Sequence, residues 1–534
     1  MAQLVYTTLL LNSKPVLTGS NFSVELHQAM TEHHELTITC PTDAIEPSLG
    51  NFADNVQKFI GQRLSLLVFK VKGAIEPSLK FMGIVTHANI NKFDGADGEI
   101  TIIAQSPTIL LSHGQDSQSY EKQTLVQIIE AATKEYRQDL VKLKVFPKNQ
   151  TPIPYTVQYK EDDFSFLQRL ATRYGEWLYY DGEQICFSGV VGSGNQELLY
   201  GQNLQSFNFS MQTRPQEHTY MAYDSLRATV HQADMSQFKK DVTNPYITHT
   251  TNESAKLFAK KPKSIYNHSL LQYGKAEIDQ ILELKSQHAL NTISFQGHSD
   301  EPGVQLAKAV GIKGIKPGYG LAGTDFYGKY IVTKIIHTIN SGGEYRNQFT
   351  GVPRDIKVPP YFSENAVPIC EEQYAIVKDN NDPEGLSRIR VQFPWQEPTK
   401  QLTPWIRVTT PYAGKGKGMH ILPELEEEVL VSFESGCAEK PVVIGTMFHG
   451  SGKSGHGGAG NYMKGFQTAS GNRLQMNDQD GSVYLADKGT ANMKFDGAGN
   501  ATTNANANHS VNAGSTHVVN VGANKNQPAQ SVIK

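Results

Sequence analysis

Polar and small residues repeat with a period of eight from Asp480 to Asn520, and Val521 breaks the small column. One column is small and another mixes apolar with polar residues: Gly481, Gly489, Gly497, Ala505 and Ala513, then Asp487, Phe495, Thr503, Val511 and Val519. An α-helix repeats every 3.6 residues and a coiled coil every seven, so neither fits this pattern. Asn, Gly, Thr and Val are poor helix formers, and eight residues suffice for one short strand and a turn.

Short strands of this kind cannot bury an apolar face or pair both of their edges within one thin chain. The octads therefore predict an intertwined β-oligomer in which neighbouring chains supply the missing partners. A Gly- and Asn-rich disordered tail is the alternative, and the segment NATTNANANHS favours it when taken by itself. The register that persists from Asp480 to Asn520 favours the ordered structure.

Alternating apolar and polar residues also fill positions 1–110, in segments such as FSVELHQAMTEHHELTITC and LSLLVFKVK. Pro, Gly, Asn and Asp separate these segments from one another. The pattern predicts a series of β-strands. Residues 190–265 show no comparably clear pattern.

Three segments space their apolar residues as helices do, at 124–140, 162–174 and 274–290. Thr124 is placed to begin the first helix. Asp162 or Asp163 can cap the second helix, which Gly175 is expected to end.

The second half of the chain predicts a smaller β-domain. Residues 366–450 contain five short strands joined by Gly, Pro and Asp turns, a size typical of an OB-type barrel. The Pro-containing stretch 352–368 is typical of a linker between domains. The predicted parts are a β-rich region with helical insertions at 1–365, the OB-type domain at 366–450, a Gly-rich linker at 451–464, the octads at 465–524 and a short tail at 525–534.

Composition limits the classes of function. A chain of 534 residues is too long for one hydrophobic core, which predicts three or four domains. The net charge of −3 argues against a protein that coats nucleic acid. The four cysteines form no CxxC pair and are typical of reduced thiols in a protein made in the cytoplasm: Cys40, Cys186, Cys370 and Cys437. Neither a signal pattern nor an apolar run long enough to cross a membrane is present, so export would need another machine.

Three segments match a known family. They are the OB segment from GLSRIRVQFPWQ to KPVVIGTMFHG (385–450), YTVQYKEDDFSFLQRLATRYGEWLYYDG (155–182) and GKYIVTKIIHTINSGGEYRNQFTGVP (328–353). They resemble VgrG proteins, the trimeric spikes of type VI secretion systems, which are related to the hub and spike of contractile phage tails. The resemblance implies a mainly β, multidomain protein with some α-helix. Two related phage-hub-like β-barrel domains would lie within 1–365, an OB-fold barrel would form the neck, and a C-terminal triangular trimeric β-helix would form the needle.

The resemblance also implies a function. The protein would be a trimeric puncturing spike and tube adaptor that delivers effectors across a target envelope. Its implied partners are two further copies of the chain, an Hcp-like tube protein at the hub, a PAAR-like tip protein on the needle, baseplate proteins and effector cargo. The target membrane would be contacted only during puncture, and nucleic acid would not be a partner. The protein would assemble in the cytoplasm and be injected without a signal peptide.

Three other functions compete with this one. The spike of a phage-derived extracellular injection particle or of a prophage tail would use the same hub and needle. A hub enzyme that degrades cell wall is disfavoured, because residues 451–464 and 525–534 are too short for an added catalytic domain. A nucleic-acid-binding OB protein is disfavoured by charge. We accordingly expect no catalytic residue, no cofactor and no enzymatic activity.

Some short motifs mimic known sites. Lys453 and Ser454 end the segment GSGKS as a P-loop would, but Met447 occupies the position of the first glycine. The segment GKGKG (414–418) could hold phosphate, yet the glutamate-rich stretch 424–428 would repel it, and a Gly-rich turn is favoured. His33-His34-Glu35 lies in an alternating strand and lacks the helical HExxH geometry.

His509 and His517 lie one octad apart and are the weak candidates for metal binding. In a trimer each would form a ring of three imidazoles near the axis, and such a ring can hold a transition metal. The His-x-His pair of iron-binding phage spike tips is absent, and Ala501 in the same column favours simple space filling. The sequence therefore predicts no metal site.

Overall fold

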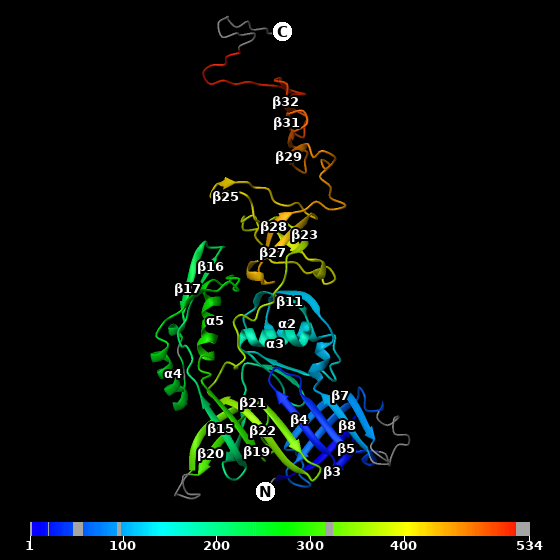
Figure 1. Ribbon diagram of the computed structural model, residues 1–534. Helices are drawn as coiled ribbons and strands as arrows, with labels where there is room; N and C mark the ends of the chain where they lie inside the picture. The colour runs from blue at the N-terminus through cyan, green and yellow to red at the C-terminus, as the bar shows by residue number, and fades with distance from the viewer. Residues whose placement is uncertain are drawn as a thin grey trace. The chain divides into compact units, whose positions relative to one another are not determined.

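The structure, a computed structural model, describes residues 3–19, 21–45, 57–92, 98–238, 240, 242–315 and 324–519. The chain divides into two compact units, Met1–Thr446 and Met447–Lys534. Both are rich in strands, and all α-helices of the described residues belong to the first unit (Figure 1). Asn520, Val521 and the predicted tail 525–534 lie outside the described residues. Within the described ranges, no helix is long and apolar enough to cross a membrane.

The largest sheet of the first unit has 14 strands and joins two sets that are distant in sequence. The first set is β1 (Gln3–Leu4), β2 (Tyr6–Leu11), β3 (Lys14–Gly19), β4 (Ser23–Ala29), β5 (Glu35–Pro41), β6 (Arg63–Phe69), β7 (Leu79–Lys92) and β8 (Gly98–Gln105). The second set is β14 (Ser193–Leu199), β15 (Leu204–Met211), β19 (Ile293–Ser299), β20 (Lys308–Ile315), β21 (Thr324–Ile339) and β22 (Glu344–Pro353). The sets join where β21 pairs antiparallel with β4 and where the short β1 pairs antiparallel with β22.

Alternating apolar and polar residues lie in strands within residues 1–110, as predicted. In β5, Leu36, Ile38 and Cys40 are buried while the residues between them are only partly buried. The path of the sheet runs β15-β19-β22-β21-β4-β5-β8-β7-β6-β2-β3. No closed barrel is found in the described part of the chain, which corrects the expectation of hub barrels. Because β4 pairs with β21 of the other set, it cannot close the first set on β3.

Local capping chemistry explains the helices. The predicted helix 162–174 is α3 (Asp163–Tyr174), with Asp162 as the cap and Gly175 ending it at φ 66°. The predicted helix 274–290 is α5 (Lys275–His288).

The helix α2 (Leu125–Thr133) begins at the Thr124 cap as predicted but ends earlier than residue 140. The Gln138 side chain donates hydrogen bonds to the carbonyls of Thr133 and Tyr136, which satisfies backbone acceptors where the helix ends. The sequence patterns missed α4 (Pro245–Leu257), although Asn244 caps it and Pro245 occupies its first position. Short 3-10 turns are η1 (Thr42–Ala44), η3 (Pro107–Ser112), η4 (Met235–Gln237), η6 (Pro394–Gln396) and η7 (Glu434–Gly436).

Three small sheets complete the first unit outside the OB segment. They contain β9 (Asp116–Gln123) with β11 (Ile153–Glu161); β10 (Leu143–Phe146) with β12 (Trp177–Tyr180) and β13 (Ile185–Ser188); and β16 (Thr219–Asp224) with β17 (Thr229–Asp234) and β18 (Lys263–Ile265). The stretch 352–368, which the sequence predicts to be a linker between domains, is packed against the rest of the first unit. Its apolar side chains are buried, at Val352, Ile356, Val358, Phe362 and Val367.

The OB segment forms a four-stranded sheet in the order β24-β23-β27-β28, from β23 (Gln373–Asp379), β24 (Arg390–Gln392), β27 (Glu428–Phe433) and β28 (Pro441–Thr446). The predicted fifth strand makes only single bridges, Ile389 with Ile406 and Val408 with Val443. Pro404 and Pro411 flank this segment and lack the N–H that a longer ladder needs, so the predicted closed OB barrel is not formed. The GKGKG segment is the turn of β25 (Ala413–Gly414) and β26 (Lys417–Gly418).

The second unit is a five-stranded antiparallel sheet of consecutive hairpins: β29 (Met463–Gln467), β30 (Arg473–Asn477), β31 (Ser482–Ala486), β32 (Asn492–Phe495) and β33 (Ala501–Asn504). Gly481 and Gly497 of the small column have φ of 71° and 79° in the turns, where a Cβ would be strained. Ala486 is the one buried residue among the described positions 447–519. A sheet this exposed on both faces lacks the apolar burial that independent stability requires.

A chain of buried polar side chains crosses the seam between β4 and β21. His34 Nε2 lies 3.0 Å from the carbonyl oxygen of Ala29 and must donate to it, so His34 Nδ1 accepts from Gln28 Nε2 at 3.2 Å. His337 Nε2 donates to Gln28 Oε1 at 3.2 Å, and its Nδ1 accepts from the Tyr345 hydroxyl at 2.6 Å. Both imidazoles are therefore neutral, and each contact has one donor and one acceptor.

Acid should weaken this seam. Burial lowers the pKa of His34 to about 4 and that of His337 to about 3, whereas both titrate near 6.5 when unfolded. The unfolded chain thus binds more protons below pH 6.5, and the free energy of unfolding should fall by about 1.4 kcal/mol per pH unit and per histidine. Urea unfolding from pH 7 to pH 5 measures this slope.

The variant His337→Gln is the matched comparison, because it removes one of the two titrating groups. Four less buried histidines with lowered pKa act in the same direction in both proteins: His33, His218, His268 and His288. Equal slopes in parent and variant would contradict the assignment.

Candidate functional site

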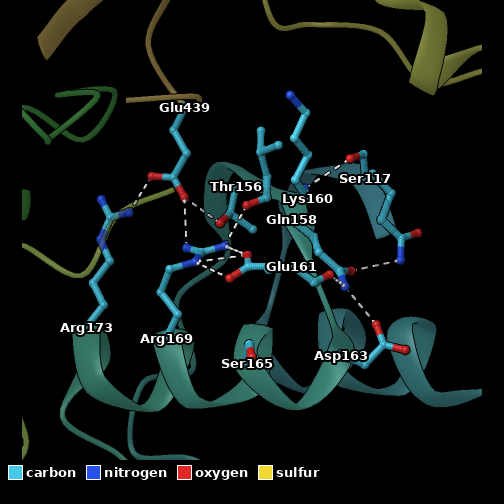
Figure 2. A network of polar contacts seen from close by, with 12 residues as sticks. Ser117, Thr156, Gln158, Lys160, Glu161, Asp163, Ser165, Arg169, Arg173 and Glu439 are labelled. Atoms are coloured by element: carbon cyan, nitrogen blue, oxygen red, sulfur yellow. Dashed lines mark hydrogen bonds and ion pairs between the residues drawn. The ribbon is translucent and has the colours of Figure 1, made fainter. Parts of the chain in front are cut away.

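Strand β11 is buried on both of its faces, which a strand at a domain border rarely is. All positions from Ile153 to Tyr159 are buried. On one face Tyr155, Val157 and Tyr159 join the hydrophobic core of the OB segment, together with Ala375, Val377, Ile389, Val391, Val429, Val431 and Val443. The other face carries Thr156 and Gln158 toward α3 (Figure 2). The candidate site is this junction between the hub region and the OB segment.

Helix α3 presents two arginines to the junction, because residues four apart lie on the same face of a helix. The Arg173 guanidinium forms an ion pair and hydrogen bond with the Glu439 carboxylate, which belongs to the OB segment (Figure 2). Thr156 Oγ1 donates to Glu439 Oε1 at 2.5 Å. Arg169 Nη1 lies 3.9 Å from the same carboxylate. The Glu439 side chain is 2% exposed, so these partners replace all of its water.

Arg169 is held in place by residues of strand β11. Its Nε and Nη2 make a bidentate contact with the Glu161 carboxylate, including a 2.6 Å hydrogen bond from Nη2 to Oε1. Nη2 also donates to the Val157 carbonyl at 2.6 Å. Glu161 therefore keeps Arg169 pointing at Glu439, while the backbone of β11 fixes its distance.

A second polar group anchors the start of α3. Gln158 Nε2 donates to Asp163 Oδ1 at 2.8 Å and to the Glu161 carbonyl at 3.1 Å. The Tyr136 hydroxyl donates to the other oxygen of Asp163 at 2.5 Å. Asp162, next to it, caps α3 by accepting from the Ser165 amide at 2.9 Å. Of the two predicted caps, Asp162 has that role and Asp163 ties the helix to β11.

The charges of the junction support each other. Burial alone would lower the pKa of Arg173, but the Coulombic attraction of Glu439 raises it well above the ordinary range. Arg173 therefore stays charged, and Glu439 is the carboxylate that pairs with it. Two buried charges of opposite sign are tolerated here only as a pair.

Contacts that are less buried than Glu439 surround this centre. Lys160 pairs with Glu371, and the Tyr159 hydroxyl donates to Glu371 at 2.8 Å. Hydrogen bonding from Lys160 lowers the pKa of Glu371 to about 2. Arg390 Nη2 donates to Glu121 Oε2 at 2.7 Å, which adds a contact from β24 to β9.

The polar side chains of the junction bind one another and hold the OB segment, β11 and α3 together. Glu439, Glu161 and Glu121 pair with arginines, and Asp162 accepts from a helix amide. Asp163 accepts from Gln158 and Tyr136, and Glu371 pairs with Lys160, so every one of these carboxylates has a structural partner. No group of three His, Cys, Asp or Glu side chains placed to hold a metal occurs in the described residues. His509 and His517 belong to the second unit, are exposed, and stay candidates only for an assembled form.

The sequence patterns did not find Glu439 or its arginines. Glu439 and Arg173 are 266 positions apart, and no local pattern records their contact. The available signal was Arg169 and Arg173 on a helix that is otherwise apolar on its inner side. Two arginines at that spacing in a buried helix require an acidic partner.

Two family models match the chain. The model described as phage tail baseplate hub matches residues 55–343, which is more than half of the 534 residues. The model described as the type VI secretion system and phage-baseplate injector OB domain matches residues 373–448.

Curated relatives and solved structures give the same picture. The type VI secretion spike protein VgrG4b of Pseudomonas aeruginosa is 30% identical over 112 residues, which cover 20% of this chain and 14% of that protein. VgrG5 of the same organism is 22% identical over 349 residues, covering 57% of this chain and 42% of that protein. The chain thus spans less than half the length of these relatives. A Francisella PdpA–VgrG complex in its lidded form has the same fold at a TM-score of 0.58, with 11% identity over 94% of this chain and 80% of that one.

Removing the buried carboxylate should destabilise the junction. In Glu439→Ala the Arg173 charge stays buried without its partner, which should lower the free energy of unfolding by about 3–5 kcal/mol. Chemical denaturation at fixed protein concentration, followed by tryptophan fluorescence, measures the change. The control is Glu371→Ala, which breaks the exposed pair with Lys160 at the same junction and should change stability little. Similar losses in the two variants would show that Glu439 has no special role.

Proposed function

The chain belongs to the phage tail baseplate hub family and is a VgrG protein, and we propose that it is the trimeric puncturing spike and tube adaptor of a type VI secretion system. In this role it would deliver effectors across a target envelope. The hub region would meet the tube, the OB segment would form the neck, and the octads would form a triangular β-helix needle.

The exposure of the second unit is the observation that carries this proposal. Its five strands bury one residue, Ala486, and leave large apolar side chains in water, including Phe466, Leu485 and Phe495. The described residues after Asn504 form no strand. Apolar burial and edge pairing must come from other chains, and a three-stranded intertwined prism would supply both. Interwound strands would then separate only by breaking many hydrogen bonds together.

The junction at β11 suits the transmission of force. A push on the hub would reach the neck through a strand that belongs to both cores and through a buried ion pair. These contacts are close-packed and contain no layer of solvent. Close-packed protein interiors have low compressibility, so the contacts would yield little under load.

The partners are part of the proposal. An Hcp-like tube protein would dock on the hub, a PAAR-like protein would cap the needle, and baseplate proteins and effector cargo would assemble around them. The protein would act by mechanics and without catalysis. It would assemble in the cytoplasm and leave by injection. His509 and His517 are the positions at which a needle metal would be sought.

Two of the competing functions can be separated by direct tests. A hub enzyme that degrades cell wall would clear a peptidoglycan suspension, whereas the spike would not. A nucleic-acid-binding OB protein would bind single-stranded DNA with strong salt dependence. Particle morphology in electron micrographs separates a type VI spike from an extracellular injection particle or a prophage tail.

Solution mass tests the trimer. The full chain should have three times the 59.0 kDa mass of one protomer and should resist detergent. Removal of residues 465–534 should abolish this stable trimer, because the strands that interlock are lost. Removal of the predicted tail 525–534 alone should leave the protein trimeric and is the control. A monomeric full-length chain would refute the proposed spike.

A further inference from the structure

The small sheet β17-β16-β18 has one buried face and one exposed apolar face. Tyr220, Ala222 and Ala233 are buried in a core with residues of α5. The alternate positions Tyr223, Val230 and Ile265 are 59%, 61% and 65% exposed. Tyr223 lies opposite Val230, and Met221 lies opposite Ile265, so these side chains form one continuous stripe across three strands. An exposed apolar surface of this kind marks an interaction site.

A basic segment runs directly into this sheet. Residues 256–263 carry four lysines, Lys256, Lys260, Lys261 and Lys263, and no acidic residue. Lys263 is the first residue of β18, and Leu257 in the same segment is 68% exposed. Lys256 pairs with Glu253, and Lys261 lies 3.8 Å from Glu217. We call the exposed stripe and these lysines together the basic-apolar face.

The OB segment carries a surface of complementary chemistry. Residues 421–428, here called the acidic loop, contain Glu424, Glu426, Glu427 and Glu428. Ile421 and Leu425 of this loop are 61% and 53% exposed. Lys378 pairs with Glu426 at 2.7 Å and is the one lysine found in an ion pair with these described glutamates. No hydrogen bond or ion pair joins the acidic loop to the basic-apolar face among the described residues of one chain.

We propose that the basic-apolar face binds the acidic loop of a neighbouring copy of this chain. Leu425 and Ile421 would pack on the stripe of Tyr223, Val230 and Ile265, and the lysines would pair with glutamates at the rim. An apolar centre with a charged rim is the usual composition of a protein interface. The inference rests on the trimer of the proposed function and adds a contact outside the needle.

The pairing of two different surfaces favours a second copy as the occupant. A contact in which one surface of a protomer meets a different surface of the next is heterologous, and such contacts close into rings when the rotation allows it. A trimer held by its needle would also keep each acidic loop near a basic-apolar face at high effective concentration. Lysines beside apolar side chains can bind anionic lipid instead, so the experiment includes that outcome.

The charged residues at the rim would determine the orientation of the two surfaces more than the affinity of the contact. Exposed ion pairs contribute little individually and are screened by salt, so the apolar stripe should supply most of the binding. The expected contact therefore weakens at high salt but depends more strongly on Tyr223 and Ile265.

Zero-length crosslinking of isotopically mixed trimers tests the proposal. Unlabelled and ¹⁵N-labelled full-length chains are co-assembled, and a carbodiimide joins lysine amines to glutamate carboxylates that are in contact. Mass spectrometry should find links between residues 256–263 and 424–428 that join a light peptide to a heavy one. The double variant Tyr223→Ser, Ile265→Ser keeps every charge and should lower the yield of these links by about tenfold.

The matched control is Val71→Ser, Val190→Ser, which removes two exposed apolar side chains elsewhere and should leave the yield unchanged. A trimer by mass without mixed links would overturn this inference and leave the proposed spike standing. A monomer would overturn both. Binding of the trimer to phosphatidylserine vesicles, lost in the Tyr223 and Ile265 variant and without mixed links, would assign the face to anionic lipid and overturn the protein contact.

Discussion

The burial of the Glu439 carboxylate is the constraint on which the junction of the OB segment with the rest of the first unit depends. A carboxylate removed from water costs several kcal/mol unless charged and hydrogen-bonding partners replace the solvent. Here the partners come from Arg173, Arg169 and Thr156, which belong to α3 and β11. The Glu439 carboxylate has these partners only when the OB segment lies against α3 and β11. Their positions are fixed in turn by the Asp162 cap and by Glu161, so the OB segment adopts one arrangement against the rest of the first unit.

The two units differ in how much apolar surface they bury within one chain. The first unit completes its cores within one chain, because the strands of both sets meet at β4 and β21 and β11 fills the OB core. The second unit buries almost nothing by itself, and its sequence is poor in the large apolar residues that a single-chain core needs. A unit that completes its cores within one chain is thus followed by a segment whose apolar burial would come from the other chains of the proposed trimer.

Local chemistry made part of this fold predictable from sequence. Thr124, Asp162 and Gly175 mark helix ends through side-chain caps and a left-handed residue, and these are visible in a few neighbouring letters. Strand alternation was equally readable in residues 1–110. The pairing of β4 with β21 was not predictable, because it joins segments more than 300 positions apart that each alternate in the same way. The stretch YTVQYK illustrates the limit, since its polar face looks solvent-exposed yet is buried against charges supplied by α3 and Glu439.

Strand β11 also decides where this protein can be divided. By sequence, the OB segment begins near residue 366, but three of its core side chains are Tyr155, Val157 and Tyr159. If an OB segment from a relative were joined at residue 366, its core would have to pack against Tyr155, Val157 and Tyr159 of this chain. Those three side chains pack with the present OB segment and not with the transplanted one. Evolutionary recombination faces the same restriction as protein engineering. The exchangeable module is therefore defined by shared packing, and a graft that respects it carries the strand 153–161 together with the neck.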